Sequence, residues 1–286
     1  MLYLSRFSFP DEDMEYQFIL RQKRTCYDSI YPFKVLSNIQ LSKISFEPIT
    51  ILCGGNGSGK TTALNIIAET LSIERDSLYN RSNFFEDYIK MCDYHVSNSI
   101  PKDSRVVTSD DVFDYVLSLR SINEGIDVRR DELLEDYLDS KYSDFHFRTL
   151  KDYDKLKKVN LVRRTTQSQY VRKSVMDNIR ENSNGESAFR YFTEKIDGRG
   201  LYLLDEPENS LSPQRQIELI EYIENSARFF QSQFIIATHS PFLLSLKGAK
   251  IYDLNQPPAS AKSWTQLDIV RKYYDFFKTH SREFEE

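Results

Sequence analysis

Ile49 to Asn65 read ITILCGGNGSGKTTALN, and the part from Gly54 to Thr61 fits the pattern G-x-x-x-x-G-K-[ST]. Glycines and small polar residues alternate here, followed by one lysine and two threonines: Gly54, Gly55, Asn56, Gly57, Ser58, Gly59, Lys60, Thr61 and Thr62. Because glycine has no Cβ atom, successive backbone N–H groups can converge on one anion. The stretch therefore predicts a phosphate-binding loop.

The flanking residues supply the context that such a loop requires. Ile49–Cys53 is a short apolar run typical of a buried strand, and Thr62–Ala68 has the apolar face of a helix. A helix after the loop adds unpaired N–H groups and the positive end of its dipole. Lys60 places a charge beside the β- and γ-phosphates, and the Thr61 hydroxyl is a ligand for Mg²⁺. A glycine-rich surface turn, the alternative, requires neither residue. We expect ATP and Mg²⁺ to bind here.

Composition limits the class of protein. The chain has 286 residues, of which 40% are hydrophobic and 28% charged, which suits one large domain or two small ones. A formal net charge of −5 excludes a uniformly basic nucleic-acid binder but leaves room for a local basic patch. Cys26, Cys53 and Cys92 are widely spaced, which favours reduced thiols in the cytoplasm over disulfides or a zinc site. The apolar runs are short, so we expect no membrane insertion.

Two further apolar runs end in polar residues that suit hydrolysis. Gly200–Leu204 precedes Asp205 and Glu206, and Gln233–Thr238 precedes His239. Ligands bind at the C-terminal ends of parallel strands, so these side chains are expected to meet the loop. Asp205 is predicted to help hold Mg²⁺ and Glu206 to polarise the attacking water. His239 is predicted to donate a hydrogen bond to the γ-phosphate, although a lone histidine is more often structural.

Taken together, these motifs resemble the ATPase domains of the ABC superfamily, and more closely its SMC/RecF-like branch of small stand-alone bacterial ATPases, often labelled AAA-type. GGNGSGKTT is similar to Walker A, and LYLLDEPENSLSP is similar to Walker B with its catalytic glutamate and D-loop. SNGES at 183–187 is similar to the signature loop, usually LSGGQ, and IIATHSP to the switch-histidine segment. The similarity extends from about Tyr31 to the C-terminal tail and is weakest across residues 70–180.

The sequence departs from the family pattern at three places. Asn184 replaces the first signature glycine, Glu186 replaces the glutamine, and the D-loop at 210–212 lacks its usual aspartate. The segment Ser109–Asp111 is our prediction for the region of the Q-loop, although it contains no glutamine. These departures bear on the control of hydrolysis and leave nucleotide binding intact.

The resemblance implies a fold and a mode of assembly. The fold is α/β, with a mainly parallel central sheet, an N-terminal antiparallel β part and a helical lobe inserted between Walker A and the signature loop. We expect one domain over 1–286, with a nucleotide-binding lobe (1–70 and 181–286) and a compact helical lobe at about 71–180. A second copy, arranged head to tail, would bring Ser183, Gly185 and Glu186 to the γ-phosphate, so that a homodimer encloses ATP.

Several functions fit such an assembly. The first is an ATP-hydrolysing switch that acts on DNA or on an effector protein, in DNA maintenance or antiviral defence. The second is a weakly active, nucleotide-gated scaffold for a nuclease or toxin, and a transporter subunit fits less well. Basic residues with interleaved aromatics between 141 and 180 suit DNA contact. A solvated helical face is the more frequent origin of such a run.

A coarse secondary-structure prediction completes the sequence analysis. Strands are expected at 16–20 and 39–46, and an edge strand at 250–254. Helices are expected at 110–119, around 132–138, at 217–223 and through 264–277. Tyr31 and Phe33 precede the loop and are candidates for stacking on adenine, although both suit a hydrophobic core equally well.

Overall fold

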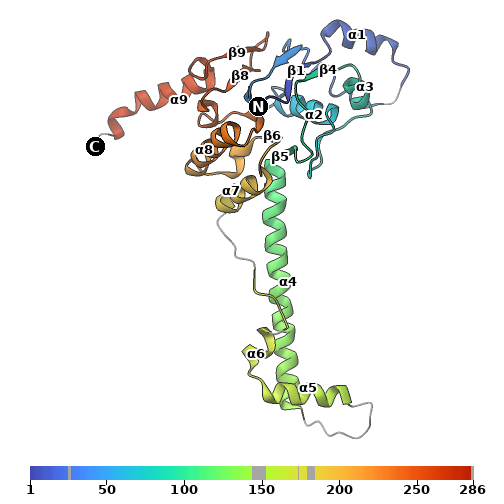
Figure 1. Ribbon diagram of the computed structural model, residues 1–286, viewed down its shortest axis with the longest axis vertical. Coiled ribbons are helices and arrows are strands. Elements are labelled where there is room, and N and C mark those ends of the chain that lie inside the picture. Colours follow the sequence, from blue (N-terminus) through green and yellow to red (C-terminus); the bar gives the residue numbers. More distant parts are fainter. Residues whose placement is uncertain (25–26, 144–152, 173, 179–183, 285–286) are drawn as a thin grey trace. The chain divides into compact units, whose positions relative to one another are not determined.

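The computed structural model describes residues 1–24, 27–143, 153–172, 174–178 and 184–284 (Figure 1). The chain divides into two compact units. The first consists of Met1–Phe113 and Asn184–Glu286, and the second of Asp114–Ser183. Residues 71–113 thus belong with the nucleotide-binding part, whereas the sequence placed them in a helical lobe.

The first unit is built on a six-stranded sheet with the order β5-β6-β7-β3-β8-β9. The strands are β5 (Arg105–Thr108), β6 (Leu201–Asp205), β7 (Gln233–Thr238), β3 (Ile49–Cys53), β8 (Lys250–Asp253) and β9 (Ser260–Lys262). The first five are parallel and β9 is antiparallel to β8, which confirms the predicted mainly parallel sheet. The strand predicted at the edge, β8, instead lies between β3 and β9.

The register of this sheet brings the predicted motifs to one edge. Every residue of β3 and β7 is buried, as expected for apolar strands inside a parallel sheet. Cys53 pairs with Thr238, and Asp205 pairs with both Ala237 and Thr108. Since Cys53, Thr108, Asp205 and Thr238 each end their strands, the segments that follow β3, β5, β6 and β7 are neighbours.

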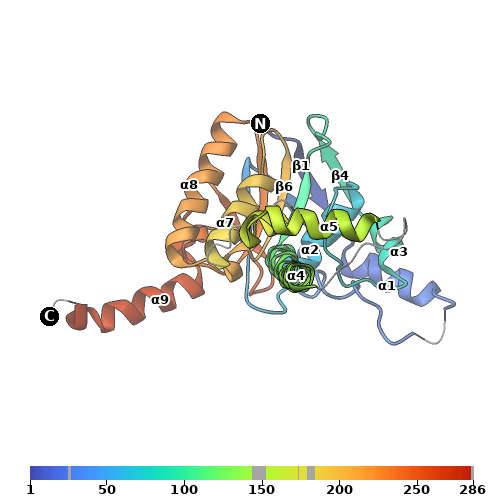
Figure 2. The ribbon, with the colours of Figure 1, turned by 90° about the horizontal axis from the view of Figure 1, so that it is seen from below.

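Helices surround this edge. α2 (Lys60–Thr70) follows β3 directly and packs against β6 and β7. α7 (Asn184–Lys195) precedes β6, and α8 (Pro213–Phe229) connects β6 to β7. α7 and α8 lie side by side, as both views show (Figure 2). α8 includes the predicted helix at 217–223 and begins at a serine N-cap, Ser212, whose side chain accepts a hydrogen bond from the Arg215 backbone.

A second, antiparallel sheet has the order β2-β1-β4 and confirms the predicted antiparallel part. Its strands are β1 (Leu4–Ser8), β2 (Lys43–Ser45) and β4 (Asp93–Val96). Phe7 and Ile44 from this sheet share one core with Leu52 and Ile66 from β3 and α2. Only the last part of the expected strand at 39–46 is extended.

The strand predicted at 16–20 is wrong, because this segment lies in α1 (Glu12–Arg21). The Asp11 side chain caps the helix by accepting a hydrogen bond from the backbone N–H of Met14. Acidic residues in the first turn and Arg21 in the last also complement the helix dipole. Tyr16 and Leu20 are 59% and 61% exposed, so their apolar character does not mark a buried strand.

One long helix replaces the two predicted at 110–119 and 132–138. α4 (Ser109–Tyr142) has 34 residues, which corresponds to about 50 Å. It contains no proline, and Gly125 costs such a helix only about 1 kcal/mol. The second unit, Asp114–Ser183, contains most of this helix. The second unit also contains α5 (Tyr153–Arg164) and α6 (Gln167–Arg172).

The remaining elements are short or lie near the C-terminus. α3 (Phe85–Ile89) precedes β4 and packs against α2. The predicted helix at 264–277 is confirmed in part, as a 3₁₀ turn (Trp264–Gln266) followed by α9 (Asp268–Thr279). A final 3₁₀ turn covers Ser281–Phe284. Among the described helices, none has the length and apolar character needed to cross a membrane.

Candidate nucleotide-binding and hydrolysis site

The loop between β3 and α2 has a backbone that glycine alone accommodates at two key points. Gly59 is the N-cap of α2 with a φ of 91°, in the left-handed region. A Cβ atom on Gly54 would lie 2.2 Å from Ser58 Oγ, far inside van der Waals contact. The loop therefore folds back on itself before α2 begins, as an anion cradle requires.

Lys60 is held inside this loop. Its side chain is only 4% exposed, and its Nζ atom donates a hydrogen bond to the Gly55 carbonyl oxygen at 3.0 Å. The same Nζ atom lies 3.2 Å from Glu206 Oε1. The buried ammonium group thus has an anionic partner, as a buried charge needs, and it points into the loop where phosphate is expected.

Thr61 and Asp205 meet beside the loop. The Thr61 hydroxyl donates a hydrogen bond to Asp205 Oδ1 at 3.0 Å. Mg²⁺ prefers oxygen ligands and is usually held by one or two protein groups together with substrate phosphates. This hydroxyl–carboxylate pair fits that requirement. Burial raises the pKa of Asp205 to about 6, although the Thr61 hydrogen bond acts against the increase.

Asp205→Asn is expected to stabilise the folded protein at pH 8 by on the order of 1–3 kcal/mol, because the folded state no longer has to bury a carboxylate. The raised pKa means that wild-type stability falls as the pH rises from about 4 to about 6. The gain should therefore be small at pH 4 and vanish at lower pH, where the carboxyl is protonated in both folded and unfolded states. Urea unfolding without nucleotide or Mg²⁺ at several pH values measures it.

The exposed Asp139 provides the control for that measurement, since Asp139→Asn removes an acid without relieving burial. An equal effect of Asp205→Asn at pH 4 and pH 8 would contradict the stated cause.

Glu206 follows Asp205 in a left-handed conformation, with φ 47° and ψ 51°. Its backbone N–H donates to the Ala237 carbonyl oxygen at 2.9 Å, and its Oε2 atom accepts a hydrogen bond from Asn209 Nδ2 at 2.9 Å. Burial alone would raise its pKa, but the Asn209 hydrogen bond and the Lys60 charge together lower it. Glu206 is therefore ionised at neutral pH, as a group that polarises water must be.

His239 lies at the same edge, directly after β7. Its Nδ1 atom is 3.9 Å from Glu206 Oε1 and 3.1 Å from Glu208 Oε1. Its side chain is partly exposed. The sequence thus correctly predicted that the ends of β3, β6 and β7 bring Lys60, Glu206 and His239 together.

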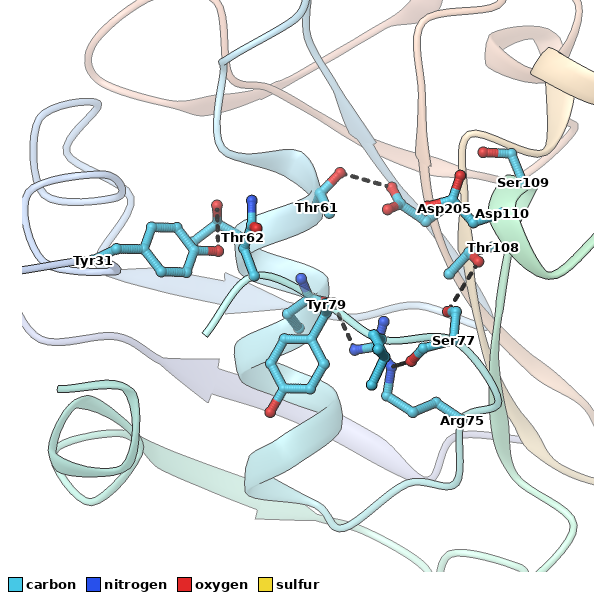
Figure 3. Close-up of a pocket in the computed structure, with 13 residues that line it drawn as sticks. Tyr31, Thr61, Thr62, Arg75, Ser77, Tyr79, Thr108, Ser109, Asp110 and Asp205 are labelled. Carbon is cyan, nitrogen blue, oxygen red and sulfur yellow. Dashed lines mark hydrogen bonds between the residues drawn. The ribbon is translucent and has the colours of Figure 1, made fainter. Parts of the chain in front are cut away.

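A cavity of about 440 Å³ opens beside Thr61 and Asp205 (Figure 3). Its lining is mostly polar and consists of Tyr31, Thr61, Thr62, Asn65, Arg75, Ser77, Leu78, Tyr79, Asn80, Thr108, Ser109, Asp110 and Asp205. Ser109 and Asp110 begin α4 directly after β5, which pairs with β6. Two residues of the segment predicted for the Q-loop region, Ser109 and Asp110, therefore line this cavity.

Of the two aromatic candidates for adenine stacking, Tyr31 alone borders this cavity. Its hydroxyl donates a hydrogen bond to Thr62 Oγ1 at 3.2 Å, next to the loop. Phe33 is 3% exposed and stacks on Phe18, with ring centroids 4.8 Å apart. Phe33 is thus a core residue. Of the two roles predicted for it from the sequence, a place in the hydrophobic core is the correct one.

The residues of the expected signature loop lie elsewhere. Gly185 and Glu186 are in the first turn of α7, whereas Ser183 lies outside the described residues. A Cβ atom on Gly185 would lie 3.8 Å from the backbone nitrogen of Ser212, in the D-loop. Among the described residues that line the cavity, none belongs to α7.

Some residues that hold the site in place were not predicted from the sequence. Asn255 Oδ1 accepts a hydrogen bond from the Gly55 N–H at 2.8 Å, although the two are 200 positions apart. Arg75 Nη1 donates to Asn65 Oδ1 at 2.8 Å in the wall of the cavity. Glu208 contacts the residues around His239. A signal existed only for Glu208, as a second acid close to Walker B.

Comparison with known protein families agrees with this geometry. A family model described as "ABC transporter" matches residues 36–209, more than half of the chain. A second, described as "AAA domain, putative AbiEii toxin, Type IV TA system", matches residues 178–245. No curated protein matches the sequence significantly.

Two solved structures are among those similar to this chain. One is the Smc head domain with an extended coiled coil, bound to the C-terminal domain of ScpA, from Pyrococcus furiosus. It is 14% identical, with a TM-score of 0.47, over 98% of this chain and 100% of that chain. The other is a nucleotide-free ATP-binding cassette from an ABC transporter, 12% identical with a TM-score of 0.42, over 96% of each chain.

Two observations define the class of protein. The first is the family match, and the second is that the loop, Walker B and switch-histidine segments lie at one edge of the sheet. The chain belongs to the ABC superfamily and is an ABC-type ATPase. The match of the AAA family model over 178–245 agrees with the SMC/RecF-like resemblance of the Walker B and switch-histidine segments.

Proposed function

We propose that this ATPase is a molecular switch in which two copies associate head to tail around ATP and Mg²⁺ and separate after hydrolysis. Gly54 to Thr62 would hold the phosphates, with Thr61 and Asp205 as the protein ligands of Mg²⁺. Glu206 would polarise the attacking water, and Lys60 and His239 would contact the γ-phosphate. The Mg²⁺ ion would neutralise charge that develops on the phosphates.

The position of α7 is the observation that carries the dimer proposal. Gly185 lies beside the D-loop, and no described residue of α7 lines the cavity next to Thr61. If the start of α7 is to contact a γ-phosphate, it does so from a second copy. In a head-to-tail pair, Ser183, Gly185 and the N–H groups of the first turn of α7 would then face the partner's nucleotide.

The contacts of Lys60 suggest how nucleotide binding prepares the site. Lys60 Nζ lies 3.2 Å from Glu206 Oε1. A γ-phosphate in the loop competes for the same ammonium group. When Lys60 turns toward the phosphate, the Glu206 carboxylate loses an ionic partner and becomes available to a water molecule. Hydrolysis and loss of phosphate would restore the Lys60–Glu206 pair.

We infer that the substrate of the switch is DNA or an effector protein, and α5 supports the DNA version. A groove of about 600 Å³ runs along this helix, lined by Tyr153, Asp154, Lys157, Lys158, Asn160, Leu161 and Arg164. It combines cations with an exposed aromatic ring, as single-stranded nucleic acid requires. Lys158 also forms an ion pair with Asp136 on α4, at 2.6 Å.

Charge reversal at Lys157, Lys158, Arg163 and Arg164 is expected to weaken DNA binding and to reduce the salt dependence of log Kd by up to about 4, roughly one for each lost phosphate contact. Fluorescence anisotropy with a labelled oligonucleotide at several salt concentrations measures both. Reversal of four exposed lysines in the first unit, Lys23, Lys43, Lys90 and Lys102, is the charge-matched control. Unchanged affinity and slope in the α5 variant would rule out this face as a DNA site.

A second candidate function is a nucleotide-gated scaffold for a nuclease or toxin, with little turnover of its own. The replacements at Asn184 and Glu186 and the D-loop without aspartate favour it. Measured ATP turnover with and without DNA separates the two functions. A transporter subunit fits less well, and co-purification with a membrane protein would support it.

Cys53 and Cys92 are both free thiols, which supports a cytoplasmic location.

A further inference from the structure

Glu208 is a buried acid at the centre of the site. It lies in the 3₁₀ turn Pro207–Ser210, between β6 and α8, and is 7% exposed. Glutamate is rarely buried to this extent unless hydrogen bonds or ion pairs compensate the charge. The groups that contact this carboxylate therefore indicate which segment it stabilises.

Three donors converge on one oxygen of this carboxylate. Glu208 Oε1 accepts hydrogen bonds from Thr238 Oγ1 at 2.7 Å, from the His239 N–H at 2.8 Å and from the Ser240 N–H at 3.2 Å. These donors are consecutive residues at the point where β7 ends. Hydrogen bonds to an ionised acceptor are about twice as strong as neutral ones. The carboxylate thus fixes the backbone on both sides of the His239 side chain.

The same turn is connected to the D-loop. Ser240 Oγ donates a hydrogen bond to Gln216 Oε1 at 2.6 Å, and Gln216 Nε2 donates to the Leu211 carbonyl oxygen at 3.0 Å. Glu208 and Gln216 therefore hold the segment after β7 against the segment that follows β6. His239 Nδ1 is 3.1 Å from Glu208 Oε1, so the ring itself also borders this carboxylate.

A general structural role for Glu208 is the competing explanation. The ladder between β6 and β7 pairs Asp205 with Ala237, and the Glu206 N–H donates to the Ala237 carbonyl oxygen. The sheet thus holds β7 up to its last residue, Thr238, which pairs with Cys53 of β3, without Glu208. The carboxylate also binds the backbone N–H groups of His239 and Ser240, which lie beyond the last strand pairing.

We propose that Glu208 is a positioning residue for ATP hydrolysis, which places the His239 ring beside the γ-phosphate by fixing the backbone after β7. This inference rests on the role proposed above for His239. It separates nucleotide binding from hydrolysis, because the hydrogen bonds and the ion pair of the Glu208 carboxylate in the described part of the chain involve Thr238, His239 and Ser240 and none of the residues from Gly54 to Thr62 that would hold the phosphates.

Two substitutions test the proposal. Glu208→Ala removes the acceptor, and hydrogen exchange of the His239 and Ser240 amides is expected to accelerate by about 10- to 100-fold. kcat should fall by a similar factor, while the KM for ATP stays within about twofold because the loop is intact. Glu208→Gln keeps the size of the side chain and one acceptor oxygen and should give intermediate values. If the alanine variant does not fold, amide exchange and kcat can both be measured on this glutamine variant instead. Glu221→Gln on α8, an exposed position, is the matched control.

A double-mutant cycle then asks whether Glu208 acts through the histidine. In a His239→Ala background, Glu208→Gln is expected to change kcat by less than about twofold, because the group that it positions is gone. An equal loss of kcat in both backgrounds, or unchanged amide exchange in Glu208→Ala, would overturn the proposal. Wild-type kcat in His239→Ala alone would instead refute the role of His239, and the exchange rates would still report on the backbone contacts.

Discussion

Glu206→Gln is expected to trap an ATP-bound dimer and to lower turnover by about 100- to 10,000-fold, the usual range when a group that accepts a proton is lost. Glutamine keeps the shape of the side chain, so Asn209 and the left-handed turn around residue 206 retain their positions. It lacks the negative charge that polarises water, and ATP therefore persists at the interface. Light scattering with ATP and Mg²⁺ measures the mass, and phosphate release measures the turnover.

Three comparisons make that experiment specific. The same variant with ADP, or with ATP and a chelator, should remain monomeric, because the γ-phosphate and the metal are both needed to bridge the copies. Glu221→Gln should behave as wild type, since this glutamate is exposed on α8. If Glu206→Gln is monomeric with ATP and Mg²⁺, the head-to-tail dimer is refuted, whatever the turnover.

Lys60→Met is expected to weaken ATP binding by about 10- to 150-fold, which corresponds to the roughly 1.5–3 kcal/mol of a hydrogen bond to a charged group. The lysine is 4% exposed and already points into the loop, so its amine needs little rearrangement to meet phosphate. Turnover should be lost together with binding. Calorimetric titration with ATP and Mg²⁺ gives the affinity directly.

The loss of Lys60 also has an effect on Glu206. The lysine charge contributes to the lowered pKa of this glutamate, so in Lys60→Met the pKa of Glu206 is expected to rise. Lys43→Met changes an exposed lysine and should leave binding and turnover intact. A wild-type affinity in Lys60→Met, with a cooperative unfolding transition that shows it to be folded, would contradict the assignment of the loop.

The centre of the fold was predictable because parallel strands leave a strong pattern. β3, β6 and β7 are buried along their length, and their continuous apolar runs are visible in the sequence. Each run ends at the sheet edge where ligands bind, so the residues that follow could be assigned to one site. For this reason the sequence could predict that Lys60, Asp205, Glu206 and His239 lie close together.

The missed parts depend on interactions that no local pattern contains. The helix α1 has apolar residues at Tyr16 and Leu20, but these face solvent, and the cap at Asp11 decides the conformation. The contact of Asn255 with the loop exists only because β8 lies next to β3. Glu208 gains its importance from three donors at the end of another strand and directly after it. Such contacts are set by the topology of the whole sheet.

Glu206 occupies a backbone conformation, φ 47° and ψ 51°, that costs a residue with a side chain about 1–2 kcal/mol more than glycine. Asparagine and aspartate visit this region more readily, and glycine would relax it fully. The chain therefore has a thermodynamically disfavoured amino acid where the backbone after β6 turns toward β7. A search for stabilising mutations would select against this glutamate, which the proposed role in hydrolysis requires.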